Sequence, residues 1–377
     1  MLSERQLREL LKVFEKRMQG VTEEYLKRMG EHLRDIGRLT DTDVHRLKQY
    51  KRMNANIKAI QREIAKAADM SAADVEQVFR AVAESDAAFA QAMFAEDYDP
   101  DVKVDRIKTL SSPLERILKA QLRVTAQEMA NLSRTTILSE GYKAAVDVAV
   151  QTVQSGLTDY RSATWKALKA AAAEGLRVQY KSGLTRRLDT AIRQNVLDGV
   201  RALNQDAFNQ LGKEFGADGV EISAHALCAE DHLPYQGLQF SNKDFDRLQN
   251  RLDRPFGMWN CKHTAHPILM GISPPAYSAQ ELEAFRNFSR EQITIDDVTM
   301  SRYEWSQQQR RIETAVREQK NIAVAAKAAD DMPARREAQR MINALQERYA
   351  AISKAAGLYE EPQRMSVSGF RRVKAAE

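Results

Sequence analysis

No glycine occurs between Gly37 and Gly141, and this gap is the strongest constraint on the fold. Glycine and proline are also scarce in the whole chain, with 16 and 9 residues in 377, about half of their usual share. Because these two residues interrupt helices, a chain that lacks them folds mainly into helices. We predict a mainly α protein with a small α+β region, in which helical arms flank a small sheet and a loop-rich His/Cys segment.

The balance of charged and apolar residues predicts a folded, soluble chain. Hydrophobic residues make up 43% and charged residues 29%, which is too much apolar material for a disordered chain. No apolar run approaches the roughly 18 residues of a membrane span, so we expect no membrane contact. The net charge is only +5, and both signs alternate along the helices. We therefore expect at most weak contact with DNA.

Apolar residues at helical spacing define the expected helices. The first set of apolar residues on one helix face includes Phe14 and Met18 and extends to Ile36. Gly37 is expected to end this helix. Another helix is expected through Ile64, a new one capped at Ser71, and a further one beginning at Ser112. The final part, which is polar, is expected to end in a frayed tail after Pro362. The predicted regions are an N-terminal helical region (1–98), a central helical region (99–215), a small-sheet motif region (216–277) and a C-terminal helical tail (278–377).

Alternation typical of strands occurs in one part of the chain. Residues 176–180 and 220–224 alternate apolar with polar side chains, and residues 237–240 form a shorter candidate. We therefore predict that the only sheet lies between about residues 176 and 275.

Residues 225–275 differ in composition from the rest of the chain. Four of the six histidines, both cysteines and five of the nine prolines fall there. Such a segment is rich in loops, so specific side-chain contacts are needed to order it.

Four side chains of this segment are of the types that bind zinc: Cys228, His232, Cys261 and His263. The second pair has a Cys-x-His spacing, which is tighter than that of most structural zinc fingers. His225 and His266 compete as ligands. The alternative is a set of hydrogen-bonded histidines and buried cysteines without metal. We expect that the protein has no cofactor. If these residues do bind a metal ion, zinc is the ion that they would hold.

A catalytic role has less support in the sequence. A metalloenzyme needs a carboxylate base beside an open coordination position, and Glu230 and Asp231 next to His232 are the candidates. The H-E-x-x-H, G-x-S-x-G and P-loop motifs are absent. Cys261 and His263 are a candidate thiolate and base, but their spacing in a loop does not ensure the geometry that catalysis needs. We therefore expect that the protein is not an enzyme.

An ordered set of motifs resembles the phage minor capsid protein 2 family. Its members here are Ser133 to Thr136, Ser155-Gly156, Tyr180 to Gly183, Asp189, Ala191 to Arg193, Gln205, Val220 to His225, His232, Gln236-Gly237, Asn260 to His263, Pro267 and Gly271. The chain departs from the family pattern at Ala229-Glu230, where Arg-Pro is expected, and at Tyr235, where tryptophan is common. Cys228 is also peculiar to this chain, which favours the metal-free alternative.

The resemblance implies a structural head protein of a tailed phage, without enzymatic activity. It implies a place in the virion near the portal, contact with portal or major capsid subunits, and assembly in the host cytoplasm. The alternative function is a metal-dependent hydrolase that is packaged in the virion and delivered with the genome. In the metal-free alternative, one set of residues anchors the loops to the small sheet: His225, His232, Gln236, Gly237, Asn260, Cys261, His263, Pro267 and Gly271.

Overall fold

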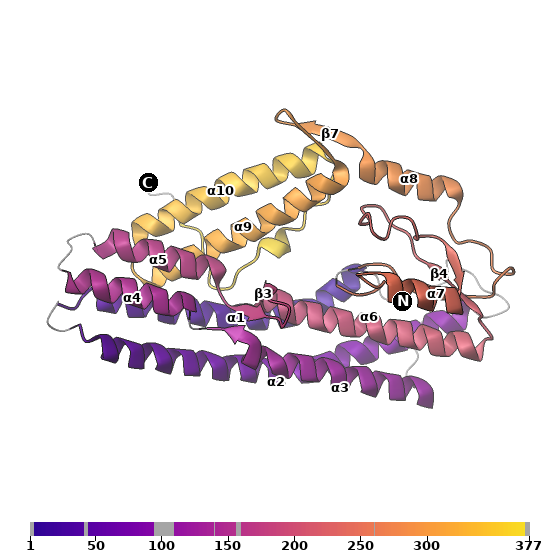
Figure 1. Cartoon of the computed structure of the whole chain (residues 1–377), viewed down its shortest axis with the longest axis horizontal. Coiled ribbons are helices and arrows are strands. Elements are labelled where there is room, and N and C mark those ends of the chain that lie inside the picture. The colour runs from indigo at the N-terminus through magenta and orange to yellow at the C-terminus, as the bar shows by residue number, and fades with distance from the viewer. Residues whose placement is uncertain are drawn as a thin grey trace. The chain divides into compact units, whose positions relative to one another are not determined.

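The computed structural model describes residues 4–40, 44–93, 109–138, 140–155, 160–259 and 261–373. Helices dominate, and the strands are short, which confirms the predicted mainly α class (Figure 1). The helices are α1 (Glu4–Ile36), α2 (Arg46–Met93), α3 (Ser112–Thr135), α4 (Glu140–Gln154), α5 (Tyr160–Glu174), α6 (Leu188–Glu214), α7 (Asn242–Arg251), α8 (Ala279–Arg290), α9 (Arg302–Ala328), α10 (Met332–Ala355) and the 3-10 helix η1 (Pro362–Met365). The strands are β1 (Thr136–Ile137), β2 (Arg177–Gln179), β3 (Thr185–Arg187), β4 (Gly219–Ile222), β5 (Gln239–Ser241), β6 (Ala265–Ile268), β7 (Gln292–Ile295) and β8 (Val298–Ser301).

Local sequence signals set several helix ends correctly. Helix α1 ends at Ile36, directly before Gly37, and α3 begins at Ser112 as expected. Contrary to the prediction of a new helix capped at Ser71, α2 runs through this residue without a break. Ser71 is fully buried, and no glycine or proline interrupts α2, so packing keeps the helix continuous. None of the helices in the described part of the chain has both the length and the apolar composition that a membrane crossing needs.

The chain forms two compact units, each assembled from three separate segments. Unit 1 consists of Met1–Lys12, Met70–Met129 and Arg193–Glu304, and unit 2 of Val13–Asp69, Ala130–Ile192 and Trp305–Glu377. Five helices, α1, α2, α3, α6 and α9, contribute residues to both units. The predicted boundary between residues 98 and 99 lies outside the described residues, and the division into four regions stays a prediction.

Unit 1 contains a three-stranded antiparallel sheet with β4 in the centre, between β5 and β6. Helix α7 follows β5 directly, and Ser241 caps it by accepting a hydrogen bond from the backbone N–H of Asp244. Phe245 and Leu248 of α7 pack on Val220 and Ile222 of β4 in one apolar cluster. This cluster also includes Cys261, so the His/Cys segment is built onto the same small core.

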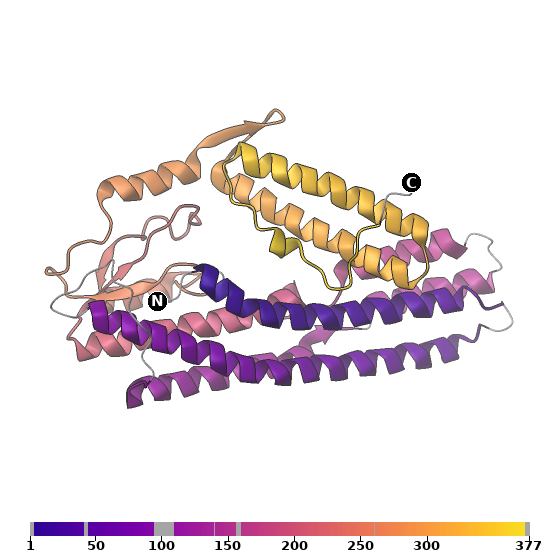
Figure 2. The same ribbon diagram turned by 180° about the vertical axis from the view of Figure 1, so that it is seen from behind.

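Unit 2 is mainly helical and has a small sheet of its own, in the order β1-β2-β3. Helices α9 and α10 lie side by side in both views (Figure 1, Figure 2). Their shared core contains Val316, Ile342 and Tyr349. Helix α1 approaches α9 closely at Gly30, where an added Cβ atom would lie 2.5 Å from the carbonyl oxygen of Ala325.

Replacing either of two glycines of α1 with alanine is expected to change the stability of the protein, but in opposite directions. Gly20→Ala should stabilise the protein by up to about 1 kcal/mol, because no atom lies within 4 Å of the new Cβ and alanine favours helix. Gly30→Ala should destabilise it by about 1 to 2 kcal/mol, because the clash with the α9 backbone outweighs that gain. Urea unfolding of the two variants measures both changes. Equal effects of the two substitutions would contradict the close approach of α1 and α9.

The prediction of a single sheet between about residues 176 and 275 is wrong. The strands expected near residues 177, 220 and 240 are present, but they belong to two different sheets. A third sheet, the hairpin of β7 and β8, lies beyond residue 275. Its turn is made by Asp296 and Asp297, both with positive φ (47° and 62°), as a two-residue hairpin turn requires. This turn has no glycine, so the sequence lacks the usual signal of a two-residue hairpin at this position.

The prediction of a frayed tail after Pro362 is also wrong for the residues up to Val373. Met365 is buried against Val316 and Tyr349, and its carbonyl oxygen accepts a hydrogen bond of 2.7 Å from Lys320 Nζ. Gln339 of α10 accepts a hydrogen bond from the backbone N–H of Val373. The tail therefore packs on α9 and α10 and is part of the core of unit 2.

Candidate functional site

The candidate site of unit 1 is formed by two loops beside the end of the central strand β4, where β6 begins. The first loop follows β4 and carries His232 in a turn where its backbone N–H donates to the carbonyl oxygen of Ala229. The second loop leads from α7 into β6 and carries Cys261 and His263. The backbone N–H of Ser223 donates to the carbonyl oxygen of Thr264, which extends the β4–β6 pairing to the residue beside His263. The sheet thus holds both loops in place.

Gln236 and Gly237 close the first loop. Gly237 has a φ of 72°, and its backbone N–H donates to the carbonyl oxygen of Ile222. An added Cβ atom there would lie 2.4 Å from Leu282 of α8. Glycine is required at this position because both the left-handed backbone and the contact with α8 exclude a side chain.

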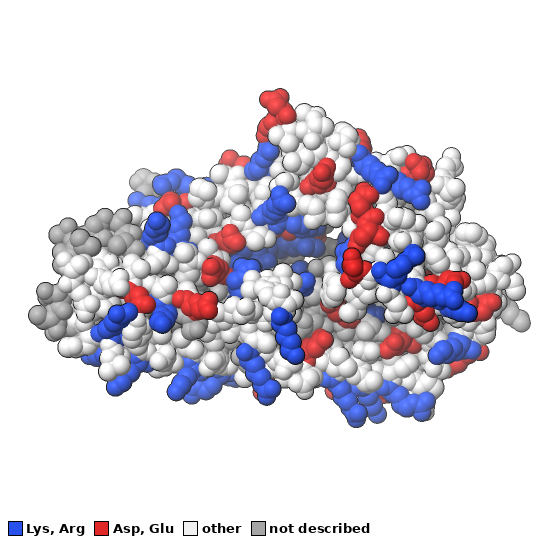
Figure 3. Space-filling model, in the orientation of Figure 1, with Lys and Arg blue, Asp and Glu red and all other residues white. Residues whose placement is uncertain are grey.

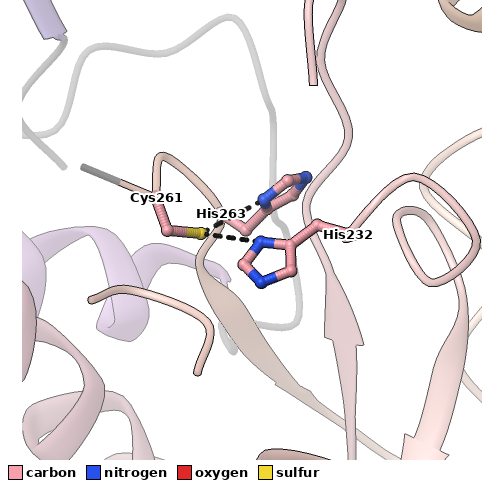
Figure 4. Close-up of side chains that lie close together, drawn as sticks. All are labelled: His232, Cys261 and His263. Atoms are coloured by element: carbon pink, nitrogen blue, oxygen red, sulfur yellow. Dashed lines mark hydrogen bonds between the residues drawn. The ribbon is translucent and has the colours of Figure 1, made fainter. Parts of the chain in front are cut away.

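Three predicted ligands meet in a buried cluster (Figure 4). Cys261 Sγ lies 3.3 Å from His232 Nδ1 and 3.3 Å from His263 Nδ1. The three potential ligand atoms lie within 4.8 Å of one another, and each residue is at most 4% exposed. Both rings point the same nitrogen at one sulfur atom, which is the arrangement that a metal ion or a strong hydrogen-bonded anchor needs.

The outer nitrogens of both rings are held by oxygen acceptors. His232 Nε2 lies 2.7 Å from the carbonyl oxygen of Arg254. His263 Nε2 lies 3.3 Å from Gln236 Oε1, an oxygen that also accepts from the backbone N–H of His225 at 3.1 Å. Because carbonyl oxygens only accept, both Nε2 atoms carry the proton. The neutral rings therefore present Nδ1 lone pairs to Cys261.

The fourth predicted ligand, Cys228, lies on the other side of the His263 ring. Its Sγ is 3.6 Å from His263 Nε2 and donates to the carbonyl oxygen of Ala229 at 3.2 Å. Cys228 thus faces the opposite nitrogen from Cys261. The structure brings three of the four predicted ligands together and leaves Cys228 beside them.

Burial keeps these groups neutral at neutral pH. It raises the pKa of the Cys261 thiol, and it raises the pKa of Cys228 to about 12. It also lowers the pKa of His232, and lowers that of His263 to about 3, with His225 and His232 adding to the second effect. Cys261 is therefore a thiol in the absence of a metal, and this does not suit a thiolate nucleophile.

The carboxylates expected to act as a base are engaged elsewhere. Glu230 pairs with Arg290 at 2.9 Å, and Asp231 pairs with Arg254 at 2.6 Å. The closest Asp231 oxygen to His232 lies 3.8 Å from Nε2, on the ring edge that faces away from Cys261. Among the residues that the structure describes, no carboxylate joins the three-residue cluster. The geometry thus gives the hydrolase alternative no base at the cluster.

The other predicted anchor residues occupy structural positions around the cluster. The His225 ring packs on His263 with ring centres 4.5 Å apart, and Pro267 pairs with Val220 across the sheet. Gly271 turns the chain after β6 with a φ of 73°. Asn260 lies outside the described residues. His266 lies apart from the cluster and packs edge-on against Phe208 of α6.

Three contributors to the site were not predicted from the sequence. Phe256 stacks on His232 with ring centres 4.2 Å apart, and Ser289 of α8 accepts a hydrogen bond from the backbone N–H of Leu227. Arg254 contributes its carbonyl oxygen. The apolar residues Phe256, Met258 and Trp259, grouped in one short loop, were a usable signal for Phe256. No sequence signal marks Arg254, because its backbone makes the contact.

Comparison with known proteins gives one family. The family model described as Phage minor capsid protein 2 matches residues 2–351, which include segments of both units and the whole candidate site. No curated protein and no solved structure gives a significant match to the chain.

Proposed function

Because this chain belongs to the phage minor capsid protein 2 family, we propose that it is a non-catalytic component of the virion, seated at the portal vertex and bound to portal or major capsid subunits. The family match over residues 2–351 is the observation that carries this proposal. A match of that length covers nearly the whole chain, so it cannot come from a single short motif that unrelated proteins share. In this proposal the protein joins the head during assembly in the host cytoplasm.

The surface charge supports protein partners over DNA. On the face drawn in Figure 3, Lys and Arg are intermixed with Asp and Glu. The net charge of the chain is only +5. Tight DNA binding needs many phosphate contacts from clustered basic residues, and such binding weakens steeply as salt rises. This surface suits at most weak contact with packaged DNA.

The helices offer apolar side chains for docking. Leu47 of α2 is 68% exposed and Val124 of α3 is 55% exposed. Apolar anchors that become buried supply most of the energy of protein–protein binding, and salt weakens them little. These two residues are therefore the first candidates for contact with portal or capsid subunits.

Co-expression with the cognate portal and major capsid proteins tests the proposal. We expect co-purification that persists from low to high salt, whereas any DNA retention fades by physiological salt. Leu47→Asp should reduce recovery of the partner if α2 is the docking helix. Gln61→Asp, an equal charge change at an exposed position of α2, is the matched control.

Failure of both partners to co-purify would contradict the proposed docking. DNA binding that survives high salt would favour a nucleic-acid-binding protein instead. These outcomes do not depend on whether the cluster of His232, Cys261 and His263 binds a metal.

A further inference from the structure

The cluster of His232, Cys261 and His263 has too few protons to give every nitrogen a hydrogen bond. A bound metal ion would satisfy the nitrogen that is left over. Both histidines use their Nε2 protons on oxygen acceptors, so each directs an Nδ1 lone pair at Cys261 Sγ. The thiol has one proton and can donate it to only one of the two nitrogens. The other lone pair would remain without a donor, which is costly at a position as buried as this one.

We propose that His232 Nδ1, Cys261 Sγ and His263 Nδ1 bind one zinc ion. On binding, the thiol proton is released to solvent and the thiolate forms the Zn–S bond. The two Nδ1 lone pairs form the Zn–N bonds, so all three groups are satisfied at once.

The two sulfur-to-nitrogen distances fit those of a zinc site. Bonds of about 2.3 Å to sulfur and about 2.0 Å to nitrogen place neighbouring S and N ligands about 3.5 Å apart. Both Sγ to Nδ1 distances are 3.3 Å. The observed distances are slightly shorter than the value expected for zinc, so the three side chains need to move apart only slightly to hold the ion.

The surroundings are those of a metal site. Metal-bound histidines donate their second N–H to a carbonyl or carboxylate oxygen, which fixes the ring. His232 has the carbonyl oxygen of Arg254 for this purpose, and His263 has Gln236 Oε1. The backbone N–H groups of Gly257 and His263 are placed to stabilise a thiolate at Cys261. The zinc ion would tie the loop after β4 to the loop before β6.

A structural role follows from the burial of the ligands and from the engaged carboxylates. All three ligands are at most 4% exposed, and Glu230 and Asp231 are held in ion pairs with arginines. Cys228 is not a ligand in this proposal, since it faces the opposite nitrogen of His263. It therefore provides a matched control, being a second buried cysteine beside the same histidine.

The test uses the full chain, purified without chelator and then exposed to zinc, with metal content measured by mass spectrometry. We expect about one zinc ion per chain in the unchanged protein and in Cys228→Ser, and loss of the metal in Cys261→Ser. Gln236→Leu should weaken zinc affinity about 10- to 100-fold, because His263 loses the acceptor that orients it. No zinc in the unchanged protein, or loss of zinc in Cys228→Ser with retention in Cys261→Ser, would overturn the proposal.

Cobalt substitution keeps the proposal testable if Cys261→Ser does not fold. Cobalt bound to the unchanged protein and to Cys228→Ser should give an intense thiolate-to-cobalt charge-transfer band of equal strength. Absence of that band would exclude Cys261 as a ligand. One cysteine with two histidines is also a set that binds copper, so stoichiometric copper in place of zinc would overturn the assignment to zinc.

Discussion

Replacing Asp189 with asparagine is expected to lower the free energy of unfolding by about 3 to 5 kcal/mol, the largest single effect that we predict. Asp189, at the start of α6, is buried and forms an ion pair with Arg317 of α9. Arg187 lies 3.8 Å from its other carboxylate oxygen, and the backbone N–H of Thr190 donates to it at 2.8 Å. Burial alone would raise the pKa of Asp189, but the two arginines outweigh it and lower the pKa. Loss of the carboxylate leaves two guanidinium groups without their buried counter-charge.

The matched control is a partly exposed ion pair of unit 2. Glu337 pairs with Lys169 at 3.0 Å, with side chains 44% and 39% exposed. Glu337→Gln should change stability by less than about 1 kcal/mol, because solvent screens the pair. Urea unfolding followed by circular dichroism compares the two variants. Equal and small losses in both would contradict the buried charge network.

The second large effect is a loss of stability in mild acid that depends on His32. His32 is fully buried, with Nε2 3.0 Å from Gln49 Oε1 and Nδ1 2.9 Å from the hydroxyl of Tyr142. Burial lowers its pKa from 6.5 to about 4, although the hydrogen bond to Gln49 opposes the change. Between these two values the unfolded chain binds a proton that the folded chain does not. Stability is therefore fully present above about pH 6.5 and falls as the pH drops toward 4.

The expected contribution of His32 is a loss of about 2 kcal/mol between about pH 7 and pH 5. His32→Gln should remove this part of the pH dependence, even if it lowers stability at pH 7. His45, an exposed histidine of the same unit, provides the control. His45→Gln is the same substitution at an exposed position, and a slope in His32→Gln no smaller than the slope in His45→Gln would refute the role of His32. Urea unfolding at the two pH values measures both slopes.

Local patterns in the sequence determined the helical class and several helix ends. Glycine and proline act within one helical turn, so the end of α1 before Gly37 and the start of α3 at Ser112 needed no knowledge of distant residues. The strands near Val178, Val220 and Phe240 could be predicted for the same reason, since alternation is a local property. The composition of residues 225–275 also identified the three residues of the buried cluster, His232, Cys261 and His263.

Tertiary structure decided which of those residues meet, because contacts between distant segments leave no local period in the sequence. Sequence spacing treats Cys228 and Cys261 as equivalent ligands, but the fold turns Cys261 toward the Nδ1 atoms and Cys228 toward Nε2 of His263. The pair of Asp189 and Arg317 joins residues 128 positions apart. The tail through Met365 is ordered by a core that α9 and α10 supply. Packing at long range, and not local propensity, fixed these features.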